Sequence, residues 1–194
     1  MPDLGKDRGR QTVDRTRRPR RRILAVLIDS GDTLVDEATE VKDERGATLR
    51  AELIPGAAAM MRALAERGYP IGLVADGFTD TFRNVFSQHG LLDLFSVMAI
   101  SEEVGVMKPD PRIFRTALDA LGIREADYGR VVMVGNHLGR DVKGANGLGL
   151  VSVWLRWSPR RSKVPADASE VPAHTIDVPM DLLGLLDRFE AERS

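Results

Sequence analysis

The feature that most constrains the fold of this chain is a repeated alternation of short apolar runs with segments of helical periodicity. The runs are four to six residues long and rich in Val, Ile and Leu, which is typical of strands buried on both faces of a sheet. The predicted strands span residues 23–28, 71–75, 97–100, 131–134 and 150–155. Strands that alternate with helices form βαβ units, which require a parallel sheet with helices on both faces. The sequence therefore predicts an α/β fold, a three-layer doubly wound parallel sheet.

Four segments between and after these strands carry the signals that start and stop helices. In PDPRIFRTALDALG, Asp110 is placed to cap a helix, Pro111 to occupy its first position and Gly122 to follow its last turn. Its apolar residues recur at helical spacing, so one face is expected to lie in the core. The other predicted helices span residues 55–68, 79–90 and 179–190.

The composition excludes several classes of protein. A chain of 194 residues can bury roughly 70% of its unfolded surface in one domain, so it needs no disulfide or structural metal. There is no cysteine, which excludes thiol chemistry and thiolate metal sites. The longest charge-free runs fall short of the roughly 18 apolar residues that cross a bilayer, and the first apolar run is too short for a signal peptide. We therefore expect no membrane segment and a cytoplasmic location.

The charge is unevenly distributed, although the whole chain carries only −1. Residues 1–22 contain nine Lys or Arg and three Asp, a local charge of +6, so the remainder carries −7. We interpret residues 1–22 as a disordered basic tail, or the product of a start codon assigned too far upstream, and residues 23–190 as the folded domain. The alternative is an arm that binds nucleic acid or another acidic partner. Because the body is acidic, only this tail is suited to nucleic acid.

Polar and charged residues stand where the predicted strands end. Ligands of parallel α/β sheets bind outside the carboxyl ends of the strands. Asp29 follows the first predicted strand, Asp76 the second, and the segment 136–141 the fourth, while Lys108 precedes the capped helix. Taken singly, Asp29 is explained as a turn cap and Lys108 as a surface residue. Their common place at one edge of the sheet favours a functional pocket.

The motifs IDSGDTL, VADG, VMKPDP and VGNHLGRD, in this order, resemble those of the haloacid dehalogenase-like (HAD) hydrolase superfamily. The resemblance covers about residues 23–190 and includes LIPGA, KPDPRIF and GANGLGLVSVW. Members of this superfamily are mostly Mg²⁺-dependent phosphatases with a Rossmann-like fold. The resemblance therefore implies a phosphorylated substrate and a Mg²⁺ cofactor.

The resemblance also implies a role for each motif residue. Asp29 matches the nucleophile, which forms an aspartyl-phosphate, and Lys108 matches the lysine that neutralises charge during attack. The implied contacts to the substrate phosphate come from Asp76, Gly77 and Lys108. The implied Mg²⁺ ligands are Asp29, the carbonyl of Gly31, Asn136 and Asp141.

Three positions depart from the pattern of this superfamily. Gly31 stands where its phosphatases usually place a second Asp as general acid and base, Ala75 where a Ser or Thr donates to phosphate, and Asn136 where an Asp binds metal. Asp32 lies one place beyond Gly31, and it either reaches the leaving group from a remodelled loop or orders the loop, as Asp in turns commonly does. The second interpretation is favoured. Asp76, beside Ala75, is a candidate ion-pair partner of Lys108.

The short connection at residues 37–52 leaves no room for a sizeable cap domain, and its mixed polar sequence is expected to form a mobile flap. An open site would suit a macromolecular substrate, or a homodimer in which the second copy serves as a lid. We predict a capless Mg²⁺-dependent phosphatase that acts through Asp29. The alternative is a catalytically weak protein that binds a phosphorylated ligand or has a regulatory role. Carbon–halogen and carbon–phosphorus cleavage stay open, although no residue favours either.

Overall fold

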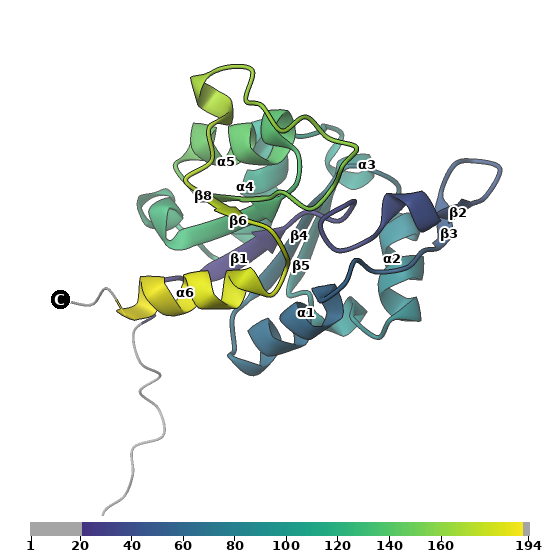
Figure 1. The fold of residues 1–194 in the computed structure, drawn as a ribbon, viewed down its shortest axis with the longest axis horizontal. Coiled ribbons are helices and arrows are strands. Elements are labelled where there is room, and N and C mark those ends of the chain that lie inside the picture. Colours follow the sequence, from purple (N-terminus) through teal and green to yellow (C-terminus); the bar gives the residue numbers. More distant parts are fainter. Residues whose placement is uncertain (1–20, 192–194) are drawn as a thin grey trace, which may run out of the picture.

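The computed structural model describes residues 21–191 and contains a six-stranded parallel sheet between two layers of helices (Figure 1). The strands follow the spatial order β5-β4-β1-β6-β7-β8, and every neighbouring pair is parallel. Their bounds are β1 Ala25–Ile28, β4 Ile71–Ala75, β5 Val97–Ile100, β6 Val131–Gly135, β7 Val151–Leu155 and β8 His174–Ile176. The predicted α/β fold with a doubly wound sheet is thereby confirmed, with strand ends shifted by at most two residues.

Alternate side chains of each strand enter two separate cores, one on each face of the sheet. Val26 and Ile28 of β1 pack with α1, α2 and α6, whereas Ala25 and Leu27 pack with α4 and α5. The helices are α1 Ala57–Glu66, α2 Thr79–Gln88, α3 Ser101–Val104, α4 Pro111–Ala120, α5 Lys143–Leu148 and α6 Asp181–Ala191. Because both faces are covered, β1, β4, β5 and β6 carry no polar side chains and do not alternate, as the sequence indicated.

Helix α4 has the ends that its sequence predicts. Asp110 is the N-cap, and its Oδ1 accepts a hydrogen bond from the backbone N–H of Arg112 at 2.9 Å. Pro111 is the first helical residue, and Gly122 follows the helix with φ +67°, a conformation that favours glycine. The start of α4 fixes the direction in which the preceding Lys108 enters the sheet edge.

The segment 37–52 is more ordered than the mobile flap that its composition suggested. It forms the short helix η1 (Glu37–Thr39) and the two-stranded hairpin β2 (Val41–Lys42) and β3 (Thr48–Arg50), which lies beside α2 (Figure 1). The backbone N–H of Thr48 donates to Oγ1 of Thr81 at 2.8 Å, and Nδ2 of Asn84 donates to the carbonyl of Thr48 at 3.1 Å. Polar side chains of α2 thus satisfy backbone groups of β3, a contact that composition alone does not reveal. No large cap domain is evident in residues 21–191.

The last two residues of the predicted basic tail, Arg21 and Arg22, contact the folded domain. The backbone N–H of Arg22 donates to Oε2 of Glu190 at 2.8 Å, and the carbonyl of Arg21 accepts a hydrogen bond from Arg130 at 2.7 Å. The rest of the predicted tail, residues 1–20, lies outside the described part of the chain, so the tail stays a prediction. Within residues 21–191, no helix has the length and apolar character needed to cross a membrane.

Two glycines of α5 provide a matched test of the packing between α4 and α5. A Cβ atom at Gly144 would overlap the ring of Phe114, whereas one at Gly147 meets nothing within 4 Å. Gly144→Ala is expected to lower the free energy of unfolding by about 1–3 kcal/mol through overpacking. Gly147→Ala should raise it by up to about 1 kcal/mol because alanine favours the helix. Urea unfolding of both variants measures the difference, and equal effects would contradict this packing.

Candidate active site

The candidate site lies at the carboxyl ends of three adjacent strands. Asp29 directly follows β1, Asp76 follows β4 and Asn136 follows β6, and β1 is the strand that pairs with both others. The chain leaves the sheet on opposite sides of β1 at this point, which opens a crevice in doubly wound sheets. The structure therefore places the predicted strand-end residues at one edge.

Lys108 binds two carboxylates at the centre of this site. Its Nζ lies 2.5 Å from Oδ1 of Asp29 and 2.7 Å from Oδ1 of Asp141, and it donates to the carbonyl of Val74 at 2.9 Å. The other oxygen of Asp29 accepts a hydrogen bond from Oγ1 of Thr33 at 2.9 Å. The Lys108 side chain is 2% exposed, so these contacts are shielded from solvent. The predicted nucleophile, cation and acidic ligand are thus brought together.

The charges of this cluster are strongly coupled. Burial alone would lower the pKa of Lys108, but Asp141 and Asp29 outweigh burial and hold that pKa above its usual value. Burial and the charge of Asp29 raise the pKa of Asp141 to about 7, although Lys108 opposes this shift. One ammonium group therefore does not fully compensate two buried carboxylates. The pocket has the electrostatic character of a site for a second cation.

Asp76 does not pair with the Lys108 amine, in contrast to the expectation from sequence. Its Oδ1 accepts a hydrogen bond from the backbone N–H of Lys108 at 2.9 Å, and its Oδ2 lies 3.4 Å from Nη1 of Arg140. The amine turns instead to the two carboxylates that lie deeper in the pocket. The backbone N–H of Gly77, expected to face a phosphate, donates to Oγ of Ser101 at 2.9 Å. Asp76 and Gly77 are therefore already engaged within the protein.

The oxygen atoms around the cluster are of the kind that Mg²⁺ prefers. Because Asn136 is an amide, they carry less negative charge than a site with three carboxylates would. Asp29, Gly31, Asn136 and Asp141 all line one cavity of about 50 Å³. Oδ1 of Asp141 is paired with the Lys108 ammonium at 2.7 Å, and its Oδ2 accepts a hydrogen bond from the backbone N–H of His137 at 2.9 Å. The Gly31 carbonyl accepts a hydrogen bond from the Asn136 amide. Residues 21–191 hold no group of three or more acidic or histidine side chains suited to a metal.

The ligands that would hold Mg²⁺ are consequently the carboxylates of Asp29 and Asp141 and the side-chain oxygen of Asn136. All are oxygens, as this hard cation prefers, and a cavity of this size leaves space for roughly one or two waters beside them. The assignment of Asp29, Asn136, Asp141 and the Gly31 carbonyl as Mg²⁺ ligands stays a prediction.

Asp32 orders the loop after β1 and does not face the cavity. Its side chain is fully buried, its backbone φ is +52°, and its Oδ2 accepts a hydrogen bond from Oγ of Ser158 at 2.7 Å. Both of its oxygens contact the guanidinium of Arg160, and the backbone N–H of Glu37 donates to Oδ1 at 3.3 Å. These contacts support the interpretation of Asp32 as a loop-ordering residue.

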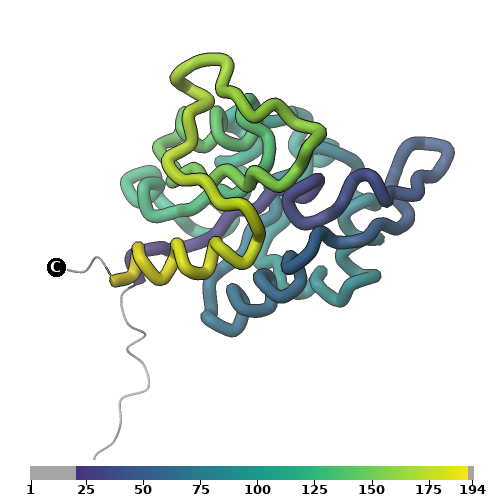
Figure 2. Tube along the Cα trace, viewed as in Figure 1, coloured from purple at the N-terminus to yellow at the C-terminus, as the bar shows by residue number. Residues whose placement is uncertain are grey.

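Two charged residues of the cavity lining were not singled out from the sequence. Arg161 and Glu37 form an ion pair of 2.5 Å between Nη2 and Oε2, and both line the same cavity as Asp29. Figure 2 shows why they meet: the segment after β7 runs beside the loop that follows β1. A separation of 124 residues leaves no local pattern that would link them. Burial raises the pKa of Glu37, and Arg161 opposes this shift.

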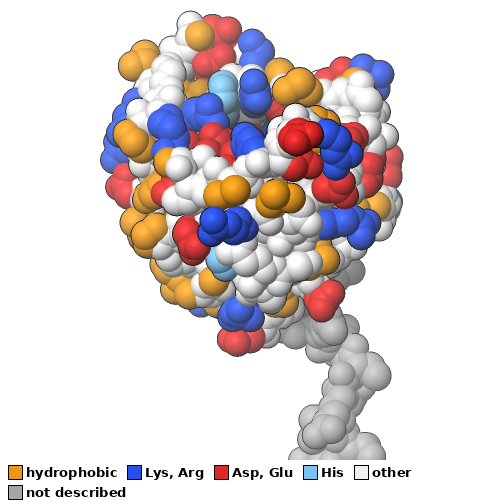
Figure 3. Space-filling view, turned by 90° about the vertical axis from the view of Figure 1, so that its right-hand side faces the viewer, with side chains coloured by type: hydrophobic (Ala, Val, Ile, Leu, Met, Phe, Trp, Pro, Cys, Tyr) orange, Lys and Arg blue, Asp and Glu red, His pale blue; other side chains and the backbone are white. Residues whose placement is uncertain are grey.

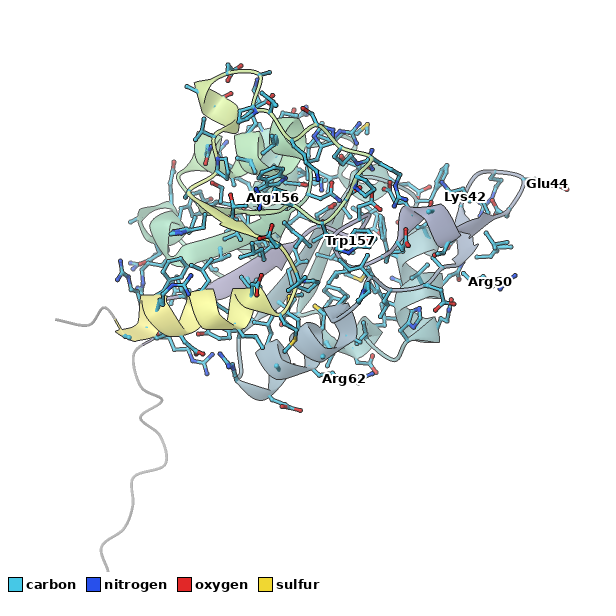
Figure 4. All side chains as sticks on the ribbon, viewed as in Figure 1. Lys42, Glu44, Arg50, Arg62, Arg156 and Trp157 are labelled. Carbon is cyan, nitrogen blue, oxygen red and sulfur yellow. The ribbon has the colours of Figure 1, made fainter. Side chains whose placement is uncertain are left out.

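A larger cavity of about 450 Å³ adjoins the small one beneath the hairpin β2–β3. Its lining combines Phe78, Phe82 and Val85 from the region of α2 with polar groups such as Lys42, which Figure 4 labels. The two cavities share four residues, namely Ser30, Gly31, Glu37 and Asp76. Figure 3 shows acidic and basic side chains intermixed on the face that carries the hairpin. A molecule held at Asp29 can therefore extend past Glu37 into the larger cavity.

Comparison with known proteins connects this geometry to described families. The family profile for haloacid dehalogenase-like hydrolases matches residues 7–149. Glyceraldehyde 3-phosphate phosphatase of Methanopyrus kandleri is 34% identical over 123 residues, which are 63% of this chain and 52% of that protein. Phosphoserine phosphatase of Thermus thermophilus is 39% identical over 106 residues, or 55% of this chain and 41% of that protein.

Solved structures show the same likeness. A HAD phosphatase from Thermococcus onnurineus superposes with a TM-score of 0.59 at 29% identity, over 70% of this chain and 59% of that one. The chain spans about half the length of the curated relatives it matches. These matches concern the domain that carries the candidate site.

Asp32→Asn tests whether Asp32 stabilises the loop. Burial would raise the pKa of Asp32, but hydrogen bonds from Arg160, Ser158 and the Glu37 backbone lower it overall. A lowered folded-state pKa stabilises the protein above the ordinary value of about 3.9, and this contribution is lost as the pH falls through the folded value. The variant should lose about 1–3 kcal/mol of unfolding free energy at neutral pH, and less at about pH 3. Urea unfolding at both pH values measures this, and a loss that does not shrink in acid would contradict it.

Proposed function

Since the chain belongs to the haloacid dehalogenase-like hydrolase family, we propose that it is a Mg²⁺-dependent phosphatase that cleaves phosphate monoesters through Asp29. The family profile covers residues 7–149, which include Asp29, Lys108 and Asp141, and relatives named as phosphatases match 55–63% of this chain. The observation that carries the proposal is the buried ammonium of Lys108, in contact with both Asp29 and Asp141. Attack of a carboxylate on a phosphate dianion requires such a cation, because two anions otherwise repel each other.

Each residue of the cluster has a defined task in this reaction. An oxygen of Asp29 forms a bond to phosphorus as the bond from phosphorus to the ester oxygen breaks, and water later releases phosphate from Asp29. Thr33 orients the Asp29 carboxylate, and Lys108 offsets the charge that accumulates on the phosphoryl oxygens. Bound Mg²⁺ would supply Lewis acidity and further charge neutralisation. Asp29, Asn136 and Asp141 would hold it.

Two arginines take the place of the hydroxyl donor that is absent at Ala75. Arg140 and Arg161 both line the small cavity and add positive charge at its mouth. Losing one positioned donor costs about 10²–10³ in rate, and a guanidinium can restore part of that through charge-assisted hydrogen bonds. Reduced but measurable turnover is consistent with this set of residues.

A phosphoryl-binding protein without turnover is the second candidate. It is favoured by the glycine at position 31, which leaves the loop after Asp29 without its own acid–base side chain. Such a protein would form the bond at Asp29 and fail to release it. Accumulation of a base-labile phosphoprotein, with no free phosphate, identifies this case.

A panel of phosphate monoesters, assayed with and without Mg²⁺, tests the proposal. We expect phosphate release that requires Mg²⁺ and that Asp29→Asn abolishes, because the amide cannot act as nucleophile. Asp93→Asn, at an exposed aspartate that precedes the amino end of β5 and does not line the small cavity, serves as the matched control and should retain activity. Equal activity of Asp29→Asn and the parent protein would overturn the assignment of the nucleophile.

Asn136→Asp tests the Mg²⁺ ligands through stability as well as activity. The added carboxylate should lower the Mg²⁺ concentration for half-maximal activity by roughly tenfold, equivalent to about 1.4 kcal/mol of binding. Without Mg²⁺, the same carboxylate faces the Gly31 carbonyl and should lower the melting temperature. Thermal denaturation with and without Mg²⁺ should therefore show effects of opposite sign. An effect independent of Mg²⁺ would remove Asn136 from the ligand set.

A further inference from the structure

The space beside Gly31 is filled by a carboxylate from another part of the chain. A Cβ atom built on Gly31 would overlap Oε1 of Glu37 and lie 2.8 Å from the carboxyl carbon of Glu37. Gly31 does not have a positive φ, so its backbone conformation does not itself require glycine. A side chain at position 31 would instead require the end of the Glu37 side chain to move. A side chain at position 31 and the carboxylate of Glu37 exclude each other.

Glu37 also lies where a leaving group would pass. It lines both the small cavity, which holds Asp29 and Lys108, and the larger cavity beneath the hairpin. An ester whose phosphoryl group sits at Asp29 and whose organic part extends into the larger cavity has its bridging oxygen at the junction. Glu37 is at that junction.

The other acidic groups near the junction are less suited to this position. Asp76 lines both cavities, but its two oxygens are engaged by the Lys108 backbone and by Arg140. Asp32 is fully buried against Ser158 and Arg160. Oε1 of Glu37 is directed at Gly31, while Oε2 is held by Arg161.

We propose that Glu37 is the acid–base residue of this site and takes over the task that an aspartate at position 31 would perform. This inference rests on the proposed phosphatase function. In the first step a proton carried on Oε1 of Glu37, the oxygen that Arg161 does not hold, passes to the ester oxygen as its bond to phosphorus breaks and the bond from Asp29 forms. In the second step water attacks phosphorus, its proton passes to Glu37, and the bond to Asp29 breaks. One water is consumed and Glu37 regains its proton.

The displaced Asp32 supports Glu37 in this position. Oδ1 of Asp32 accepts the backbone N–H of Glu37 at 3.3 Å, and Asp36 caps the short helix that begins at Glu37. Arg160 contacts both Asp32 and Asp36, and Arg161 holds Glu37 itself. Moving the carboxylate from position 31 to position 32 thus frees space for Glu37 and anchors its backbone. Asp32 is a positioning residue in this arrangement.

Substrates that differ in leaving group separate an acid–base role from a structural one. Glu37→Gln should reduce kcat/KM for phenyl phosphate and an alkyl phosphate by about 10²–10³, because their leaving oxygens need a proton. The loss for p-nitrophenyl phosphate should stay below about tenfold, since that leaving group departs without one. Glu44→Gln is the matched control: Glu44 is exposed at the hairpin tip, where Figure 4 shows it directed away from the domain, and its activity should be unchanged.

Moving the carboxylate from position 37 to position 31 tests whether the two side chains occupy the same space. Gly31→Asp alone should lower the melting temperature, because its side chain meets the carboxylate of Glu37. Adding Glu37→Ala should restore stability, and the double variant should recover turnover of phenyl phosphate relative to Glu37→Ala alone. Stability is measured without substrate, so this readout does not depend on activity.

The outcomes distinguish failure of this inference from failure of the proposed function. If the parent protein releases phosphate and Asp29→Asn does not, but Glu37→Gln slows every ester equally or none, the acid–base role is wrong and the phosphatase stands. If the parent protein cleaves no ester, both the phosphatase function and the acid–base role of Glu37 are wrong. The stability of Gly31→Asp with and without Glu37→Ala still tests the geometry in that case. Stability losses from Gly31→Asp that Glu37→Ala fails to relieve would show that the two side chains do not share one space.

Discussion

The ammonium group of Lys108, buried against Asp29 and Asp141, is the interaction on which the rest of the site depends. Two carboxylates in a poorly screened pocket repel each other strongly, so they persist there only if cations compensate them. Lys108 compensates one charge, and the remaining charge makes the pocket suitable for a divalent cation. The rigid sheet makes this possible, because the Val74 carbonyl fixes the amine while Asp29 follows the neighbouring strand.

The loop after β1 is governed by a second constraint, which is competition for space. Glycine at position 31 leaves room for the carboxylate of Glu37, and Asp32 is turned away into a buried contact with Ser158 and Arg160. A buried carboxylate is stable only with such partners. The departures from the family pattern at Gly31 and Asp32 thus belong to one rearrangement, which also involves the segment after β7. They need not indicate the decay of an active site.

The hairpin and the long connections of the molecule lie outside the sheet, next to the candidate site. Strand ends hold the charged cluster, whereas residues of the hairpin β2–β3 and of the segment after β7 line the larger cavity beside it. In α/β proteins the scaffold positions the chemistry and the loops select what reaches it. Phe82 and Val85 of α2 give part of the wall of this cavity an apolar character.

The sequence by itself determined the sheet, its flanking helices and the edge at which Asp29, Lys108 and Asp141 meet, because strand and helix periodicities and helix caps are local signals. It also indicated that Asp32 orders its loop. Only the tertiary structure decided the partners of Lys108 and the place of Glu37, and it showed the segment 37–52 as an ordered hairpin. The physical reason is that these contacts join residues tens of positions apart, such as Glu37 and Arg161. The energies of these contacts depend on burial and on the relative orientation of the side chains. Neither property produces a periodic pattern in the sequence.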